Sequence, residues 1–116
     1  MKFISSSMIG IEQGDDVLFS DYQDEGDMWT GKGPRERRHA VFFERPYHKV
    51  PSVFVSLSMW DIDTENNARA DVSAETISED GFEIVFKTWG DTRVARARVR
   101  WMAIGPIVNE DDWELY

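Results

Sequence analysis

The chain has 116 residues, of which 41% are apolar and 13% aromatic, and it contains no cysteine. This length supports one hydrophobic core, so we expect a single domain over residues 1–116 with its folded core at about 10–105. The 22 acidic and 13 basic residues give a formal net charge of −9, which disfavours nonspecific binding to nucleic acid or anionic lipid.

The same inventory argues against several other classes of protein. No apolar run is long enough for a transmembrane helix, and the first residues lack the long apolar region of a signal peptide, so neither is expected. Without cysteine, a disulfide framework and thiolate metal sites are ruled out. The compartment stays open between cytoplasmic, non-classically exported and virion-associated.

Both ends of the chain are acidic. Residues 1–30 hold seven acids and one lysine, and residues 107–116 hold four acids and no base. Such charge blocks are typical of solvated segments at chain ends. The tail over 107–116 also carries Trp113 and Tyr116. Because aromatic side chains favour burial, the alternative is that this tail docks on its own domain or on a neighbouring subunit.

Period-two alternation of apolar residues dominates the sequence after residue 39. Residues 11–38 are expected to form a strand followed by a long loop, because three glycines and a proline interrupt residues 26–34. The alternation then predicts strands over 40–44, 50–58, 68–74, 82–87 and 94–104. No segment shows a sustained helical period. Short strands separated by turn signals predict an all-β, antiparallel sandwich or barrel.

The sequence carries no recognisable catalytic motif. His39 and His48 form no HxH or HExxH pattern, and no GxSxG elbow is present. The Gly31-Lys32-Gly33 triplet is neither a Walker loop nor a dinucleotide-binding fingerprint. Carboxylates are abundant, but no spacing selects a glycosidase-like pair of acids. We therefore expect a protein that is not an enzyme and uses no cofactor or metal.

Two groups of arginines need charge partners. The Arg-Glu-Arg-Arg run over 35–38 is suited to gripping a phosphate or carboxylate, or is neutralised within this acidic protein or across a subunit contact. Arg96, Arg98 and Arg100 lie on one face of the last strand, about 7 Å apart. Such a row needs acids opposite it, from a neighbouring strand or another subunit. No aromatic residues alternate with these arginines on their own face, which argues against a nucleic-acid groove.

Trp89 stands at the end of a predicted strand, beside Gly90 and Asp91. Most tryptophans belong to a hydrophobic core, and this chain has five. An aromatic ring at the rim of a sheet with polar neighbours is also what sugar binding requires, because the apolar face of a pyranose stacks on the ring. From the residues alone, both interpretations of Trp89 stay open.

Several fragments together form a pattern: Phe43–Tyr47, Pro51–Leu57, Asp61, Arg69, Gly81-Phe82, Thr88-Trp89, Asp91-Thr92 and Trp101–Ile104. In their order and spacing, over about residues 10–105, they resemble the H-type lectin domain, a family that includes snail agglutinins and the C-terminal domain of slime-mould discoidins. The resemblance implies a six-stranded antiparallel β-sandwich that assembles as a trimer, or as a pair of trimers. It also implies sugar sites at the clefts between adjacent subunits, typically favouring N-acetylgalactosamine.

The resemblance places four carbohydrate-binding positions on this chain. The family's sugar-contacting arginine falls on Arg69, and its stacking tryptophan falls on Trp89. Gly90 replaces the histidine that bonds the sugar in the snail lectins. The family's loop aspartate falls near Lys32, which is expected to arrive from the neighbouring subunit's loop and which reverses the charge. Two cations beside an aromatic ring favour an acidic glycan over neutral N-acetylgalactosamine.

Two functions of different kinds are consistent with these residues. The first is a lectin-like carbohydrate-binding module, and the alternative is a structural, oligomerisation or adhesion module of a phage or microbial surface assembly. If Arg69 does not bind a ligand, it is expected to pair with Asp61 or Asp63 and to anchor the 61–68 loop. A trimer or hexamer is expected, with the arginine row near the threefold axis or salt-bridged to acids between subunits.

Overall fold

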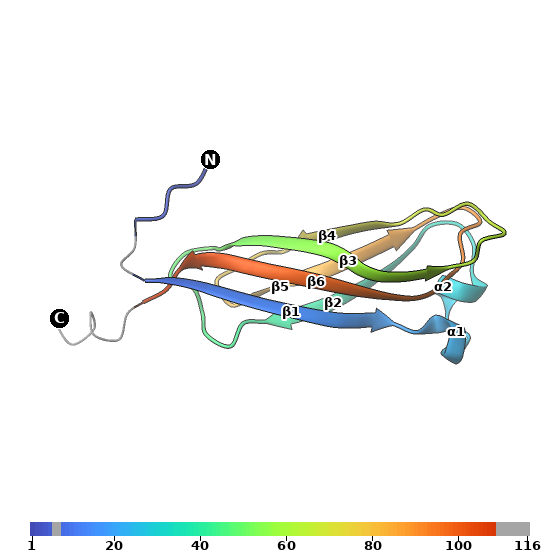
Figure 1. The fold of residues 1–116 in the computed structure, drawn as a ribbon, viewed down its shortest axis with the longest axis horizontal. Helices are drawn as coiled ribbons and strands as arrows, with labels where there is room; N and C mark the ends of the chain where they lie inside the picture. Colours follow the sequence, from blue (N-terminus) through green and yellow to red (C-terminus); the bar gives the residue numbers. More distant parts are fainter. Residues whose placement is uncertain (6–7, 109–116) are drawn as a thin grey trace.

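A computed structural model of the protein describes residues 1–5 and 8–108. They form two three-stranded sheets packed face to face (Figure 1). The first sheet orders its strands β1 (Ile9–Phe19), β6 (Val94–Pro106), β3 (Ser52–Ile62), and the second orders them β2 (Arg35–Phe42), β5 (Gly81–Thr88), β4 (Asp71–Glu75). Every neighbouring pair is antiparallel. The predicted all-β antiparallel sandwich is therefore confirmed.

The segment between β1 and β2 differs from the predicted long loop. It contains two short helices, α1 (Asp21–Asp24) and α2 (Asp27–Thr30), and β2 already begins at Arg35. The apolar pattern missed the start of β2 because Arg37 and His39 occupy its inward positions. An edge strand tolerates such residues: Arg37 reaches Asp21 at 2.7 Å, and the imidazole of His39 lies 3.9 Å from Asp16.

β4 begins at Asp71, three residues later than the predicted start at residue 68. The preceding carbonyl groups are bound by side chains instead of by a neighbouring strand. The Thr88 hydroxyl donates to the carbonyl oxygen of Arg69, and the Thr92 hydroxyl donates to that of Asn67. These bonds satisfy the carbonyl groups of residues 67 and 69 without extending the sheet.

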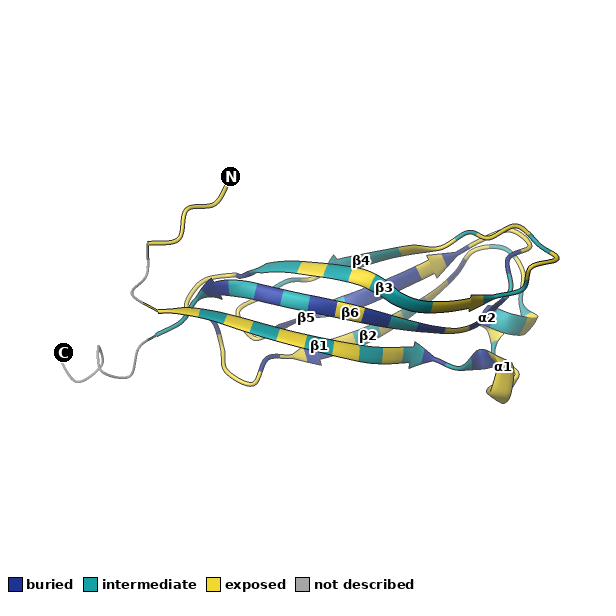
Figure 2. Ribbon diagram, in the orientation of Figure 1, coloured by how far each residue is buried: buried dark blue, intermediate teal, exposed yellow. Residues whose placement is uncertain are grey.

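The hydrophobic core lies between the two central strands. β6 follows the predicted alternation, and Figure 2 shows buried residues alternating with more exposed ones along it. An edge-on aromatic contact joins Trp101 of β6 to Phe82 of β5, with ring centroids 5.3 Å apart. The Trp101 indole also lies over Gly14 of β1 and donates to Asp16 at 3.2 Å. A methyl group on Gly14 would lie 2.3 Å from the indole nitrogen, so this position must lack a side chain.

The outer face of the β1-β6-β3 sheet carries the arginine row. Arg96 pairs with Asp61 of β3 at 3.3 Å, while Arg98 and Arg100 share Asp15 of β1 at 3.5 and 3.3 Å. The acids come from neighbouring strands of the same chain, as one of the two alternatives predicted. Each arginine of the row therefore has an acidic partner within the chain, and because three arginines share two carboxylates the row keeps one net positive charge.

The same outer face becomes apolar toward the start of β1. Ile9, Ile11 and Phe54 are 46%, 59% and 60% exposed. They lie in register with Pro106, Ile104 and Met102 of β6, respectively. A shallow hollow of about 340 Å³ opens beside Phe54 and Met102 and extends to Arg100. We call this area the apolar patch; it gives the sheet a surface suited to contact with another protein chain.

The loops are divided between the two ends of the sandwich, and three of them gather at the end away from the start of β1 (Figure 1). Residues 20–34, 63–70 and 89–93 gather at one end, which we call the loop end. At the other end, the first residue of β1 pairs with the last residue of β6, Ile9 with Pro106. The expected docking of Trp113 and Tyr116 lies outside the described residues. In the part of the chain that is described, no helix has the length and apolar character needed to cross a membrane.

Candidate functional site

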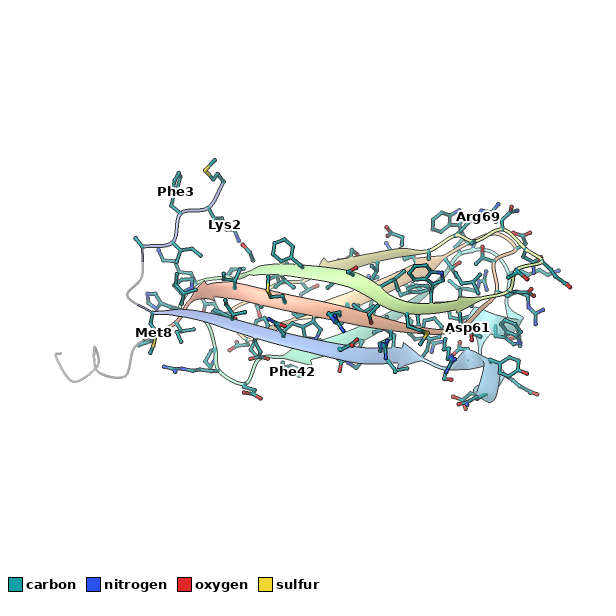
Figure 3. The ribbon with its side chains drawn as sticks, viewed as in Figure 1. Lys2, Phe3, Met8, Phe42, Asp61 and Arg69 are labelled. Carbon is teal, nitrogen blue, oxygen red and sulfur yellow. The ribbon has the colours of Figure 1, made fainter. Side chains whose placement is uncertain are left out.

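Three of the four predicted site residues meet at the loop end. Trp89 follows β5 directly, Gly90 is next to it, and Arg69 lies two residues before β4 (Figure 3 labels Arg69). Gly90 has a φ of +69°, and a methyl group there would lie 3.0 Å from a guanidinium nitrogen of Arg69. The guanidinium therefore rests against the glycine, in space that any side chain at position 90 would contest.

Trp89 is accessible in the single chain. The residue is 44% exposed, so the interpretation of Trp89 as a core residue is wrong. By contrast, Trp101 is 5% exposed and fills the core. An exposed indole at the rim of a sheet, one residue before the glycine on which the Arg69 guanidinium lies, offers a flat apolar face and a hydrogen-bond donor in the same turn.

The partner of Arg69 is Asp91. A guanidinium nitrogen of Arg69 donates to the Asp91 carboxylate at 2.6 Å, and this hydrogen bond holds the pKa of Asp91 below its ordinary value. The expected pairing of Arg69 with Asp61 or Asp63 is wrong, because Asp61 pairs with Arg96 and Asp63 binds the 63–66 turn and Arg93. Arg69 thus links the 67–70 segment to the turn that carries Trp89.

Lys32 lies in a loop that touches the same turn. The amide of Gly33 donates to the carbonyl oxygen of Gly90 at 2.9 Å, and Lys32 itself is exposed. Among the described residues, no ion pair of Lys32 is formed. The loop is therefore beside Gly90 within one chain, and its approach to a second subunit stays a prediction.

The arginines of the 35–38 run have separate roles. Arg37 binds Asp21 and Asp27, both at 2.7 Å, and Arg38 binds Glu36, Glu75 and Glu83 on the outer face of the second sheet. For these two, neutralisation within the chain is confirmed, so they are not free to grip a phosphate.

Arg35 behaves differently: the sequence placed it in the 35–38 run, but its partners are backbone carbonyl groups, neither a ligand nor acidic side chains. It is 8% exposed, and its guanidinium donates to backbone carbonyl oxygens of Gly33, Gly90 and Thr92 as well as of α2. No motif could reveal this arrangement, because all of its acceptors are main-chain atoms. The alternation of a strand, which turns Arg35 and Arg37 to the same side, was the only available signal.

A second aromatic group at the loop end is occupied by its own chain. The Arg93 guanidinium lies 4.0 Å from the centre of the Trp29 ring, and Tyr22 meets the same ring edge-on at 5.2 Å. Arg93 also donates to the carbonyl oxygen of Trp29 and pairs with Asp63. Trp29 is therefore a structural element of the loop end, which leaves Trp89 as the better platform for a ligand.

The resulting arrangement is suited to binding a ligand. It combines an exposed indole, a guanidinium fixed by Asp91, and an exposed ammonium group in the adjacent loop. Within residues 1–5 and 8–108, no group of three or more His, Asp or Glu side chains is placed to hold a metal ion. Such a set can stack on the apolar face of a ring and bond its hydroxyl or carboxylate groups.

Comparisons with known sequences show what this chain is similar to. The family model of the H-type lectin domain matches residues 38–104. The curated protein "ATP synthase subunits region ORF 7" of Fuscovulum blasticum is 54% identical over 107 residues, covering 92% of this chain and 93% of that protein. A discoidin-1 polypeptide of Dictyostelium discoideum is 32% identical over 75 residues, 64% of this chain and 30% of that protein.

Solved structures share the same fold. Recombinant discoidin II of Dictyostelium discoideum superposes with a TM-score of 0.75 at 23% identity, covering 90% of this chain and 40% of that one. The tailspike protein gp49 of Pseudomonas phage LKA1 gives a TM-score of 0.53 at 15% identity, covering 87% of this chain and 15% of that one. The chain spans less than half the length of either discoidin, and at these identities the superpositions show the fold alone.

Proposed function

Since this chain belongs to the H-type lectin family, we propose that it is a carbohydrate-binding module whose sugar site is built around Trp89 and Arg69 at the loop end. The observation that supports this most strongly is that the exposed Trp89 shares a turn with Gly90 and Asp91, which contact and hold the Arg69 guanidinium. A preorganised site of this kind loses less side-chain entropy when a ligand binds.

Each residue of the proposed site has a distinct task. Trp89 stacks on the apolar face of the sugar, which contributes on the order of 0.5–1.5 kcal/mol beyond the burial of its area. Arg69 donates charge-assisted hydrogen bonds to ring hydroxyls or to a carboxylate, at about 1.5–3 kcal/mol. Gly90 leaves room for the Arg69 guanidinium, and Asp91 fixes its direction.

The charges at the site favour an acidic glycan. Lys32 and Arg69 contribute two cations, and Asp91 contributes one carboxylate, which Arg69 occupies. A uronic acid, a sialic acid or a phosphorylated sugar would therefore meet an unpaired ammonium group, whereas neutral N-acetylgalactosamine would gain no charge pairing there.

We also propose that the protein assembles through the outer face of the β1-β6-β3 sheet, as a trimer or a pair of trimers. The apolar patch supports this, because Ile9, Ile11 and Phe54 leave contiguous apolar surface in water. Assembly would place several sugar sites on one particle.

A structural or adhesion module of a larger assembly is the alternative function. Two observations favour it: the fold is shared with a phage tailspike protein, and Arg69 is already engaged by Asp91. In that case Arg69 and Asp91 would serve only to join the 67–70 segment to the 89–92 turn.

A glycan array containing both neutral and acidic sugars separates the two functions. We expect the wild-type protein to bind acidic glycans, Trp89→Ala and Arg69→Ala to lose that signal, and Phe42→Ala to retain it. Phe42 is an exposed aromatic residue (80%) at the far end of β2, so it controls for the loss of any surface ring (Figure 3). An array on which the wild-type protein is silent would favour the structural module.

A further inference from the structure

Arg35 is buried between the two backbone segments that carry the proposed site. Its Nε group donates to the carbonyl oxygen of Gly33 at 2.9 Å, and one Nη group donates to those of Thr92 and Gly90 at 2.7 and 3.4 Å. The other Nη group donates to the carbonyl oxygens of Asp27 and Met28 in α2, both at 3.2 Å. One guanidinium therefore binds α2, the Lys32 loop and the Trp89–Thr92 turn together.

We propose that Arg35 is a positioning residue that holds the Lys32 loop against the Trp89–Thr92 turn and so sets the distance between Lys32 and the Arg69–Trp89 pair. The expected effect of Arg35 on sugar binding rests on the proposed function. Its effect on the position of the Lys32 loop rests on the geometry alone. Arg35 itself is buried and is not proposed to touch the sugar.

The chemistry of the acceptors explains why this residue is an arginine. In the described residues Arg35 forms no ion pair, and all five of its acceptors are backbone carbonyl oxygens. Burying a charge is costly unless hydrogen bonds compensate it, and here the carbonyl dipoles provide that compensation. Only a flat guanidinium with donors along its rim can reach carbonyl groups on three segments at once, whereas a lysine ammonium is a compact point charge.

The Lys32 loop has little else to hold it at this place. Gly33 has a φ of +74°, and a methyl group there would meet nothing within 4 Å, so the outer side of the loop is open. Besides the β2–β5 ladder, which begins two residues later with Arg35 opposite Thr88, the described residues add one backbone hydrogen bond, from the Gly33 amide to the Gly90 carbonyl oxygen, and Arg35 donates to the same oxygen. Loss of the guanidinium should therefore release the loop while the sandwich stays folded.

The test compares Arg35→Lys with Arg38→Met, which alters an arginine on the outer side of the same strand. Amide hydrogen exchange is measured at Gly33 and, as an internal control, at Phe43 and Tyr47, whose amides bond to Asp80 and Glu79 at the opposite end. We expect Arg35→Lys to speed exchange at Gly33 by about tenfold or more and at the two controls by less than about twofold, because local opening does not require global unfolding. Arg38→Met should leave all three rates near those of the wild type.

Sugar binding is then measured by titration with N-acetylneuraminic acid, with N-acetylgalactosamine alongside. Arg35→Lys should weaken binding of the acidic sugar by about tenfold, which corresponds to about 1.4 kcal/mol. Wild-type protein that binds neither of these sugars nor any glycan on the array overturns the proposed function, and the exchange rate of Gly33 still decides whether Arg35 positions the loop.

Two results would overturn the proposal for Arg35. One is an unchanged exchange rate at Gly33 in Arg35→Lys, and the other is equal acceleration at Gly33, Phe43 and Tyr47, which would show a merely structural role.

If the variant does not fold, the wild-type protein provides a second measurement. The Nε proton of Arg35 should exchange slowly, and that of Arg100, whose side chain is 70% exposed, should exchange quickly. Fast exchange at Arg35 would contradict the arrangement.

Discussion

Replacement of Gly90 by alanine tests whether the sugar site depends on the exact place of the Arg69 guanidinium. The new methyl group would lie 3.0 Å from Nη1, 3.3 Å from Cζ and 3.6 Å from Nε of Arg69. The first two contacts are too close, so the guanidinium must move away by a few tenths of an ångström or more. That movement also disturbs the 2.6 Å hydrogen bond to Asp91.

The expected loss of stability comes mainly from the backbone. Gly90 has a φ of +69°, and placing a side chain in the left-handed region costs roughly 1–2 kcal/mol. Gly33→Ala is the matched control for this cost, because Gly33 has a φ of +74° and its methyl group would meet nothing within 4 Å. The free energies of unfolding of the two variants should agree within about 0.5 kcal/mol, since the Arg69 side chain is flexible and its ion pair is exposed.

Urea denaturation gives the two stabilities, and titration with the acidic glycan that binds on the array gives the affinity. We expect Gly90→Ala to weaken glycan binding by about tenfold, because a charge-assisted hydrogen bond contributes about 1.5–3 kcal/mol and is partly lost. The Arg69 Nε resonance should shift in Gly90→Ala. Wild-type affinity in Gly90→Ala, with that resonance shifted, would show that Arg69 does not bind the sugar.

Further variants address the charges, the core and the assembly. Arg69→Ala and Lys32→Glu should both weaken the binding of an acidic glycan. Calorimetry should find the free energy of unfolding of Lys32→Glu within about 0.5 kcal/mol of the wild-type value, as for most surface substitutions. A lower melting temperature for Arg69→Ala with glycan binding intact would show that Arg69 has a structural role only. Gly14→Ala should destabilise the protein by about 1–3 kcal/mol, because its methyl group would lie 2.3 Å from the Trp101 indole nitrogen; unfolding in urea measures this, and an unchanged midpoint would contradict the packing. Arg69 lowers the pKa of Asp91, so the stabilisation by this carboxylate is present above its unfolded-state pKa and disappears as the pH falls through the lower folded-state value. Asp91→Asn should therefore reduce the slope of melting temperature against pH below about pH 4, and an identical acid branch in both proteins would argue against the pairing. Phe54→Arg, in the apolar patch, should give a monomer by light scattering if this face joins the subunits, and an unchanged oligomer would place the interface elsewhere.

The fold was predictable where the apolar pattern of the sequence matches the side of the strand that is buried. β6 is the best example, since Val99 and Trp101 are buried while Arg98 and Arg100 face outward. The start of β2 was not predictable, because its inward Arg37 is satisfied by Asp21 in α1 rather than by apolar neighbours. Edge strands can place charged side chains at inward positions, and the hydropathy pattern then predicts a loop where the strand begins.

The candidate site was only partly accessible from the sequence. The positions of Arg69, Trp89 and Gly90 came from the family resemblance, and the structure does bring these three together. The partner of Arg69 was assigned to the wrong loop, because Asp91 reaches it across a turn whose course the sequence does not reveal. Arg35 was missed as an organising residue since carbonyl oxygens, which every residue has, are its acceptors.

The opposite placement of the loop end and the Ile9–Pro106 pair has a practical consequence for how this domain can be attached to something else. A fusion partner or surface linked near either of these residues would hold the sandwich with its loop end away from the support (Figure 1). Several copies attached in this way would present their loop ends on the same side. Weak individual contacts with a glycan-covered surface would then add through high effective concentration, without any change in the site itself.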